Sequence, residues 1–117
     1  MPYLALLEGL LRSVPGAETA LLLDSEGEVV FEAGERGLRP RLIGAYQGIA
    51  LQAARRTGGR YLTGEVRSMH CRYAGGQVVL VALKDGYYAI LALRADASGA
   101  LGLRRAHEYG RRLDAEL

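Results

Sequence analysis

Leucines recur at the spacing of an α-helix along the first stretch of the chain. In residues 3–13, Leu4, Leu7 and Leu11 fall on one helical face. The Val-Pro-Gly sequence at 14–16 then ends the helix, because proline disfavours a helical residue before it and lacks an N–H donor. The pattern predicts a short amphipathic helix.

Two apolar runs follow, at 20–23 and 29–31, with Asp-Ser-Glu-Gly between them. Asp24 can accept hydrogen bonds from the turn backbone and Gly27 can adopt a positive φ. The pattern predicts a β-hairpin.

Three further strands are predicted at 62–74, 77–84 and 87–95. Glycines separate the first two, and Asp85-Gly86, a strong hairpin signal, separates the last two. The short turns make sequential strands antiparallel.

Two more helices are predicted. One covers about 39–56 and ends at the Thr-Gly-Gly of 57–59. The other runs to the C-terminal end, and Asp96 or Ser98 can cap it. Along one side of this last helix recur Leu103, Ala106, Gly110, Leu113 and Leu117.

The element order predicts an α+β fold, built as one domain over residues 1–117. The runs 78–83 and 87–93 are apolar on both sides, which is typical of central strands in a sheet covered on both faces. We expect the first and last helices on one face and the middle helix on the other. The more polar strand around 66–73 is expected at an edge.

Gly44 and Gly48 are unusual inside a helix, since each costs roughly 1 kcal/mol relative to alanine. Helical projection groups the apolar Leu42, Tyr46, Ile49 and Ala53 on one side, which we expect to pack on the sheet. The other side carries Gly44, Gly48, Leu51 and Arg55, bordered by Gln47 and Gln52.

A helix surface without side chains allows close approach of another helix. We therefore expect this helix to pair with its own copy in a two-fold homodimer. The alternative is that the glycines are merely tolerated. The predicted edge strand supports a dimer, because its unpaired N–H and C=O groups need a partner. It places Met69, Cys71 and Tyr73 on one face, and Ser68, His70 and Arg72 on the other.

Composition excludes several classes of protein. The 117-residue chain has a net charge of +2, one lysine (Lys84) and one cysteine (Cys71), so an intrachain disulfide is impossible. The apolar start lacks a basic leader and is interrupted at Glu8, and no apolar run is long enough to span a bilayer. We expect a soluble cytoplasmic protein without membrane insertion.

Catalytic chemistry is not predicted. Adjacent strand residues such as His70 and Cys71 point to opposite faces, so the imidazole cannot activate the thiol. His107 is expected to be solvated, and no metal-ligand cluster or phosphate-binding lysine motif is present. We expect neither cofactor nor metal. A solvated rim is expected for the carboxylates of the first hairpin and connector, Glu26, Glu28, Glu32 and Glu35.

Arginines are grouped at the end of the middle helix and along the last one. Arg55, Arg56 and Arg60 complement the carboxyl-end dipole of the middle helix. Glu108 is spaced to pair with Arg104 or Arg112. Exposed aromatics are not interleaved with these arginines, so we expect a solvated face or a protein rim and no nucleic-acid binding.

Four segments together resemble the Roadblock/dynein-light-chain family, in particular the bacterial branch that includes the gliding regulator MglB: the leading helix, residues 14–34, the small-residue helix and residues 84–113. The resemblance spans nearly the whole chain. It implies a profilin-like fold with a five-stranded antiparallel sheet of order 2-1-5-4-3 and the middle helix alone on one face. It also implies a non-enzymatic homodimer that binds Ras-like small GTPases or acts as a scaffold; some bacterial members accelerate GTP hydrolysis without inserting an arginine.

Carried over to this sequence, the resemblance implies a dimer interface made of Gly44, Gln47, Gly48, Leu51, Gln52 and Arg55 with Met69, Cys71 and Tyr73. No long extension follows the last helix, so contacts made by such a tail are not expected. The expected GTPase surface carries Arg39, Arg41, Gln47, Gln52 and Arg55, whose arginines favour an acidic partner. Two alternatives stay open: a scaffold without effect on GTP turnover, and a small-ligand sensor, for which no pocket-lining polar cluster is found.

Overall fold

The computed structural model describes residues 2–35, 44, 48 and 67–117. Both Gly44 and Gly48 are helical, as predicted, and the rest of the predicted middle helix lies outside the described residues. The elements are α1 (Pro2–Ser13), β1 (Ala17–Leu23), β2 (Val29–Gly34), β3 (Ser68–Tyr73), β4 (Gly76–Ala82), the 3-10 turn η1 (Lys84–Gly86), β5 (Tyr88–Leu93) and α3 (Gly99–Glu116).

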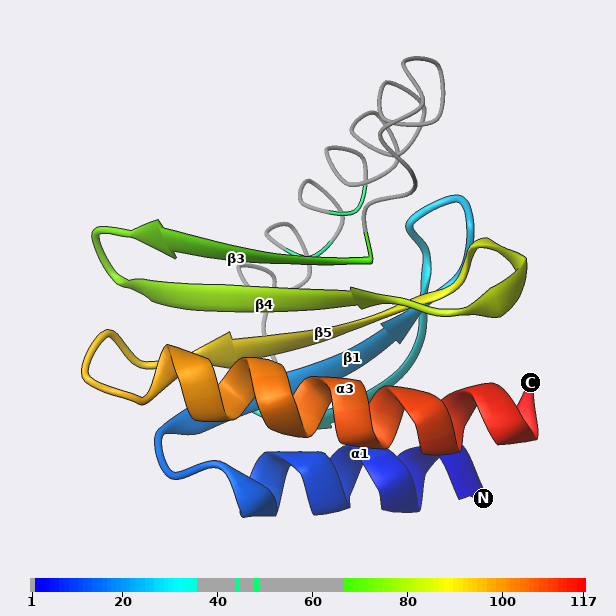
Figure 1. Ribbon diagram of the computed structural model, residues 1–117, viewed down its shortest axis with the longest axis horizontal. Coiled ribbons are helices and arrows are strands. Elements are labelled where there is room, and N and C mark those ends of the chain that lie inside the picture. The colour runs from blue at the N-terminus through cyan, green and yellow to red at the C-terminus, as the bar shows by residue number, and fades with distance from the viewer. Residues whose placement is uncertain (1, 36–43, 45–47, 49–66) are drawn as a thin grey trace.

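The five strands form an antiparallel sheet in the order β2-β1-β5-β4-β3 (Figure 1). This is the order that the family resemblance implies. The apolar runs form β4 and β5, which lie inside the sheet and are buried along almost their whole length. The polar strand β3 lies at an edge, so both predictions about strand position are confirmed.

α1 and α3 lie side by side on one face of the sheet, as predicted (Figure 1). Leu7 and Leu10 of α1 and Leu113 of α3 are completely buried there. They pack in one cluster with Val79 and Leu91 of the central strands. Burial of each leucine-sized side chain contributes roughly 1.5–3 kcal/mol to folding, so this face supplies much of the core.

The opposite face of the sheet lies under the two helical glycines. The prediction that Gly44 and Gly48 face away from the sheet is wrong. A Cβ on Gly44 would lie 3.0 Å from Cδ1 of Leu21 and 3.3 Å from Cδ1 of Ile90. A Cβ on Gly48 would lie 2.5 Å from both Cε2 and Oη of Tyr88. Both glycines are buried within their own chain. They face their own sheet rather than a second chain, because large sheet side chains occupy the space that a Cβ would need.

The predicted turn chemistry is confirmed in both hairpins. Oδ1 of Asp24 accepts hydrogen bonds from the N–H groups of Glu26 and Glu28, at 2.9 and 3.0 Å. Gly27 has a φ of +85°. Between β4 and β5, Asp85 and Gly86 both adopt positive φ, at 59° and 79°, a region that aspartate tolerates and glycine enters freely.

Of the two predicted caps for α3, Ser98 is the one used. Its Oγ accepts a hydrogen bond from the N–H of Leu101 at 3.1 Å. This bond satisfies a backbone donor of the first turn that has no partner within the helix.

Candidate protein-interaction surface

β3 carries its apolar side chains on the same face of the sheet as the helical glycines. Met69 and Cys71 lie opposite Leu80 and Val78 of β4. Those two β4 residues belong to the apolar cluster on the glycine side. Because cross-strand partners share a face, the predicted alternation along β3 is confirmed.

We call three residues on one face of this strand the β3 strip: Met69, Cys71 and Tyr73. Their solvent exposure is intermediate between that of the core and that of the open surface. Met69 packs against the glycine-side cluster, Cys71 is half-buried, and Tyr73 is 36% exposed. β3 pairs with β4 on one side, and no other described strand lies along its outer side. An edge strand with exposed apolar side chains favours pairing with another chain.

His70 points to the α1–α3 face, away from Cys71. Its cross-strand partner Val79 belongs to the cluster under α1 and α3, whereas Val78, opposite Cys71, belongs to the other cluster. The predicted divergence of the two side chains is confirmed. An imidazole on one face cannot take a proton from a thiol on the other, so the pair does not form a cysteine nucleophile site.

Gln77 at the start of β4 holds His70 in place. It is fully buried, and its Oε1 lies 2.8 Å from Nε2 of His70. Its Nε2 lies 3.1, 3.3 and 2.9 Å from the carbonyl oxygens of Arg94, Ala95 and Ala97. Since the amide nitrogen faces carbonyls, the amide oxygen must accept the bond from His70, which therefore carries its proton on Nε2.

This hydrogen-bonded centre escapes prediction from the sequence. The available signal is small: Gln77 is one polar residue at the start of an otherwise apolar run. Only the fold shows that it reaches the loop between β5 and α3, which lies 17–20 residues further along the chain. Gln77 thus connects His70 of β3 with the loop before α3 through side-chain hydrogen bonds.

The remaining residues predicted for the two interfaces are not among those that the structure describes. The helix residues predicted for the dimer and for the GTPase surface lie outside the described residues: Arg39, Arg41, Gln47, Leu51, Gln52 and Arg55. The structure therefore places the β3 strip and the two glycines of the predicted set, on the same side of the sheet.

The arginines of α3 are arranged differently from the prediction. Nη1 of Arg105 donates to Oε2 of Glu108 at 2.9 Å, so Glu108 pairs with neither Arg104 nor Arg112. The hydrogen bond from Arg105 lowers the pKa of Glu108; desolvation opposes it, and the nearby positive charges reinforce it. Arg112 instead lies over the ring of Tyr109, 4.7 Å from its centre, in a cation–π contact.

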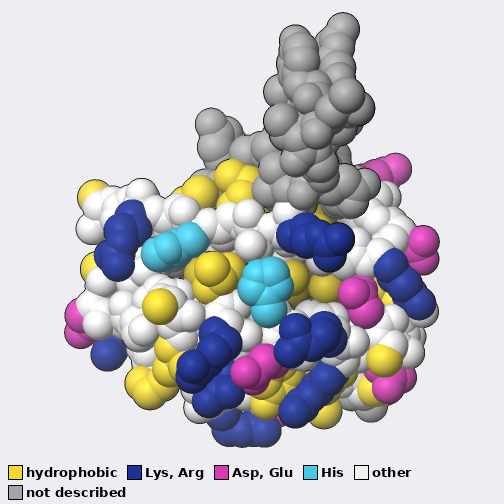
Figure 2. Space-filling view, viewed as in Figure 1, with side chains coloured by type: hydrophobic (Ala, Val, Ile, Leu, Met, Phe, Trp, Pro, Cys, Tyr) yellow, Lys and Arg dark blue, Asp and Glu magenta, His cyan; other side chains and the backbone are white. Residues whose placement is uncertain are grey.

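The α3 face is rich in basic side chains. In Figure 2, lysine and arginine side chains gather around the two histidines, with few acidic groups among them. His107 is half-buried beside this group, rather than solvated as predicted. A surface of this composition is suited to an acidic protein segment.

The carboxylates of the first hairpin lie mainly in solvent. Glu26, Glu28 and Glu35 are exposed, as the sequence predicts, while Glu32 is half-buried. In residues 2–35 and 67–117, no three or more His, Cys, Asp or Glu side chains are grouped so as to hold a metal ion. None of the helices described is both long and apolar enough to cross a membrane.

Neither a protein-family model nor a curated protein matches the sequence, whereas solved structures match it along nearly its whole length. A Roadblock/LC7 domain from Streptomyces avermitilis superposes with a TM-score of 0.84 at 18% identity, covering 99% of this chain and 96% of that one. Myxococcus xanthus MglB superposes with a TM-score of 0.83 at 13% identity, covering 97% and 92%. The chain has the Roadblock/LC7 fold.

The similarity extends more weakly to profilins. A profilin in the LokiProfilin1/rabbit actin complex gives a TM-score of 0.58 at 12% identity, covering 97% of this chain and 94% of that one. The profilin-like architecture implied by the sequence is therefore confirmed. Within the Roadblock/LC7 fold of this chain, the β3 strip is the described surface that best fits an interaction with another protein.

Proposed function

We propose that this chain is a non-catalytic, cytoplasmic module that forms a homodimer and binds a Ras-like small GTPase. The observation that carries the proposal is the apolar β3 strip on an edge strand of a Roadblock/LC7 fold. The sequence resemblance to the MglB branch supports the GTPase as partner, and the similarity to the MglB structure agrees with it.

The dimer is proposed to form through the outer edge of β3, which would join two five-stranded sheets across a two-fold axis. Tyr73 and Cys71 are then placed where a second copy would bury them. We leave Gly44 and Gly48 out of the proposed interface, because a Cβ at either position would meet side chains of their own sheet.

The β3 edge is tested by Tyr73→Asp, analysed by sedimentation velocity over a range of protein concentrations. An aspartate buried in the interface between two copies is expected to weaken the dimer at least about tenfold. Val30→Asp is the matched control: Val30 is exposed to 43% on β2, at the opposite edge of the sheet. A monomeric parent protein, or a Tyr73→Asp variant that dimerises like the parent, contradicts the proposal.

The GTPase is tested by affinity capture from the native host, followed by GTP hydrolysis with the captured protein. Faster hydrolysis in the presence of this chain identifies a regulator that stimulates turnover. Binding with unchanged hydrolysis identifies the scaffold alternative. The residues expected to contact the GTPase remain those predicted from the sequence, Arg39, Arg41, Gln47, Gln52 and Arg55.

A further inference from the structure

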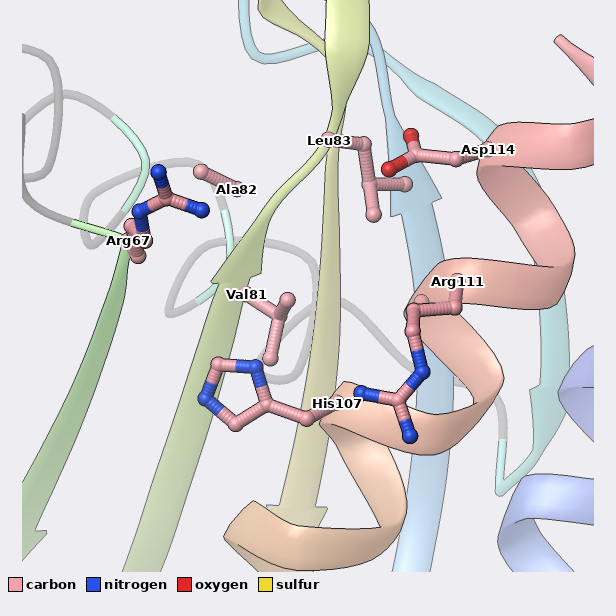
Figure 3. A pocket seen from close by; sticks show the side chains of 8 residues that line it. Arg67, Val81, Ala82, Leu83, His107, Arg111 and Asp114 are labelled. Carbon is pink, nitrogen blue, oxygen red and sulfur yellow. The ribbon is translucent and has the colours of Figure 1, made fainter.

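A hollow of about 210 Å³ lies between α3 and the β3–β4 edge of the sheet. Val81 and Leu83 of the β4 side and Gly110 of α3 give it an apolar floor (Figure 3). Val81 and Leu83 belong to the cluster under α1 and α3. The hollow is therefore on the face of the sheet opposite to the helical glycines and the β3 strip.

Three basic side chains surround this floor. Arg67 precedes β3, while His107 and Arg111 lie one turn apart on α3 (Figure 3). Both arginines are exposed and His107 is half-buried. Asp114 also lines the hollow, but its Oδ1 accepts a hydrogen bond from the backbone N–H of Lys84 at 2.9 Å.

The three basic side chains have no ion-pair partner within residues 2–35 and 67–117. Counting Asp114, the two arginines leave the hollow with an excess of one positive charge when His107 is neutral. Arginine presents a planar fork of N–H donors that matches a carboxylate in a bidentate pair.

We propose that this hollow is a second protein-binding site, which receives an acidic side chain of a partner with an apolar neighbour packed on Val81 and Leu83. Its volume is below the roughly 300–1,000 Å³ of sites for drug-sized ligands, and it fits one or two side chains. The hollow lies on the face of the sheet opposite to the β3 strip, and its lining residues are not among those proposed for the dimer or the GTPase surface, so its test is separate from theirs.

The probe is the capped dipeptide N-acetyl-glutamyl-leucinamide, titrated at low salt into the isotope-labelled full chain and followed by amide chemical shifts. N-acetyl-glutaminyl-leucinamide has the same size without the charge, and inorganic phosphate supplies a free anion. The acidic peptide is expected to shift Arg67, the segment 81–83 and the segment 107–111. These shifts should weaken as salt screens the charges.

Variants locate the site. Arg67→Gln and Arg111→Gln are each expected to weaken binding of the acidic peptide roughly two- to fivefold, as for other partly exposed ion pairs. Arg12→Gln is the matched control, since it removes the same charge from an exposed arginine of α1 that pairs with Glu8 at 3.8 Å. Both test positions are exposed, and a dispersed amide spectrum confirms that each variant is folded.

Three outcomes overturn the proposal. Equal binding of the glutaminyl peptide shows an apolar contact without charge recognition. Stronger binding of phosphate than of the acidic peptide at the same residues assigns the hollow to a free anion. The absence of chemical-shift changes, or an equal loss of peptide binding in Arg12→Gln, shows that the hollow is not a specific binding site.

Discussion

Helical glycines lie against both faces of the sheet, but the side chains beneath them differ. At Gly110 of α3, a Cβ would lie 3.2 Å from Cγ1 of Val81 and 3.3 Å from Cδ2 of Leu83. At Gly48 it would lie 2.5 Å from atoms of the Tyr88 ring. A methyl at the end of an aliphatic side chain can move by a few tenths of an ångström, whereas a buried aromatic ring in a packed cluster cannot.

The comparison shows that a glycine in a helix marks a close approach without identifying what approaches. On the α3 face, Gly110 contacts the ends of aliphatic side chains, so an alanine there should require only small shifts of Val81 and Leu83. On the other face, Gly48 is required by Tyr88. Among the described residues, each face also holds one buried polar side chain: Gln77 at the edge of the α1–α3 face, and on the glycine side Thr19, whose Oγ1 donates to the carbonyl oxygen of Glu35 at 2.8 Å.

The largest effect is expected from Gln77→Leu, which tests the polar part of the α1–α3 face. Leucine removes the donor to the carbonyl oxygens of Arg94, Ala95 and Ala97 and the acceptor of His70. Unsatisfied buried polar groups make this loss cost about 2–4 kcal/mol. Urea unfolding followed by circular dichroism measures it.

His70→Ala is the control for this variant. It removes only one of the four hydrogen bonds of the Gln77 side chain, the one to His70. Because His70 is exposed, the substitution should cost about 1 kcal/mol. If Gln77→Leu is no more destabilising than His70→Ala, the hydrogen bonds from Gln77 to the loop before α3 contribute nothing to stability.

An intermediate effect separates the two glycines. Gly48→Ala places a methyl against Tyr88 and is expected to lower the free energy of unfolding by about 1–3 kcal/mol, despite a helix-propensity gain of about 1 kcal/mol. In Gly110→Ala the same gain offsets a milder contact, so stability should stay within about 1 kcal/mol of the parent.

Unfolding curves at several protein concentrations separate this loss from dimer dissociation, which depends on concentration. A Gly48→Ala protein that is folded as stably as Gly110→Ala, but has become monomeric, would restore the glycines to the interface between chains. That outcome would mean that the Tyr88 ring can move away from a methyl group at position 48 with little loss of stability.

Much of the fold was predictable because local rules and the global arrangement agree. The apolar runs of β4 and β5, the turn at Asp24 and the positive φ of Asp85 all follow from residue chemistry. The sheet order required the family resemblance, because antiparallel strands joined by short turns are compatible with several orders.

The face of the middle helix was not predictable from helical periodicity. Periodicity groups Gly44 with Gly48 and separates them from Leu42 and Ile49, but it does not say which group meets the sheet. The deciding residue is Tyr88, 40 positions after Gly48, whose ring fills the space above β5. A pattern within one element cannot contain that information.

The smallest effect concerns Glu108 on the exposed side of α3. Its pKa is lowered from 4.5, first by the hydrogen bond from Arg105, so the folded protein favours the carboxylate more than the unfolded chain does. The resulting stability is present above the unfolded pKa and is lost as pH falls through the lowered folded pKa. Glu108→Gln should therefore reduce stability slightly at pH 7, and this difference should disappear below the folded pKa.

Carboxyl chemical shifts of Glu108 followed against pH measure the cause directly. Arg105→Gln should raise its pKa toward 4.5, whereas Arg112→Gln should leave it unchanged, because Arg112 lies over Tyr109 and does not pair with Glu108. Arg104 and Arg111 also lower the pKa through their charge, so a part of the shift should survive in Arg105→Gln and decrease with added salt. An unchanged pKa in Arg105→Gln would show that the general charge of α3, rather than the hydrogen bond, holds Glu108 ionised.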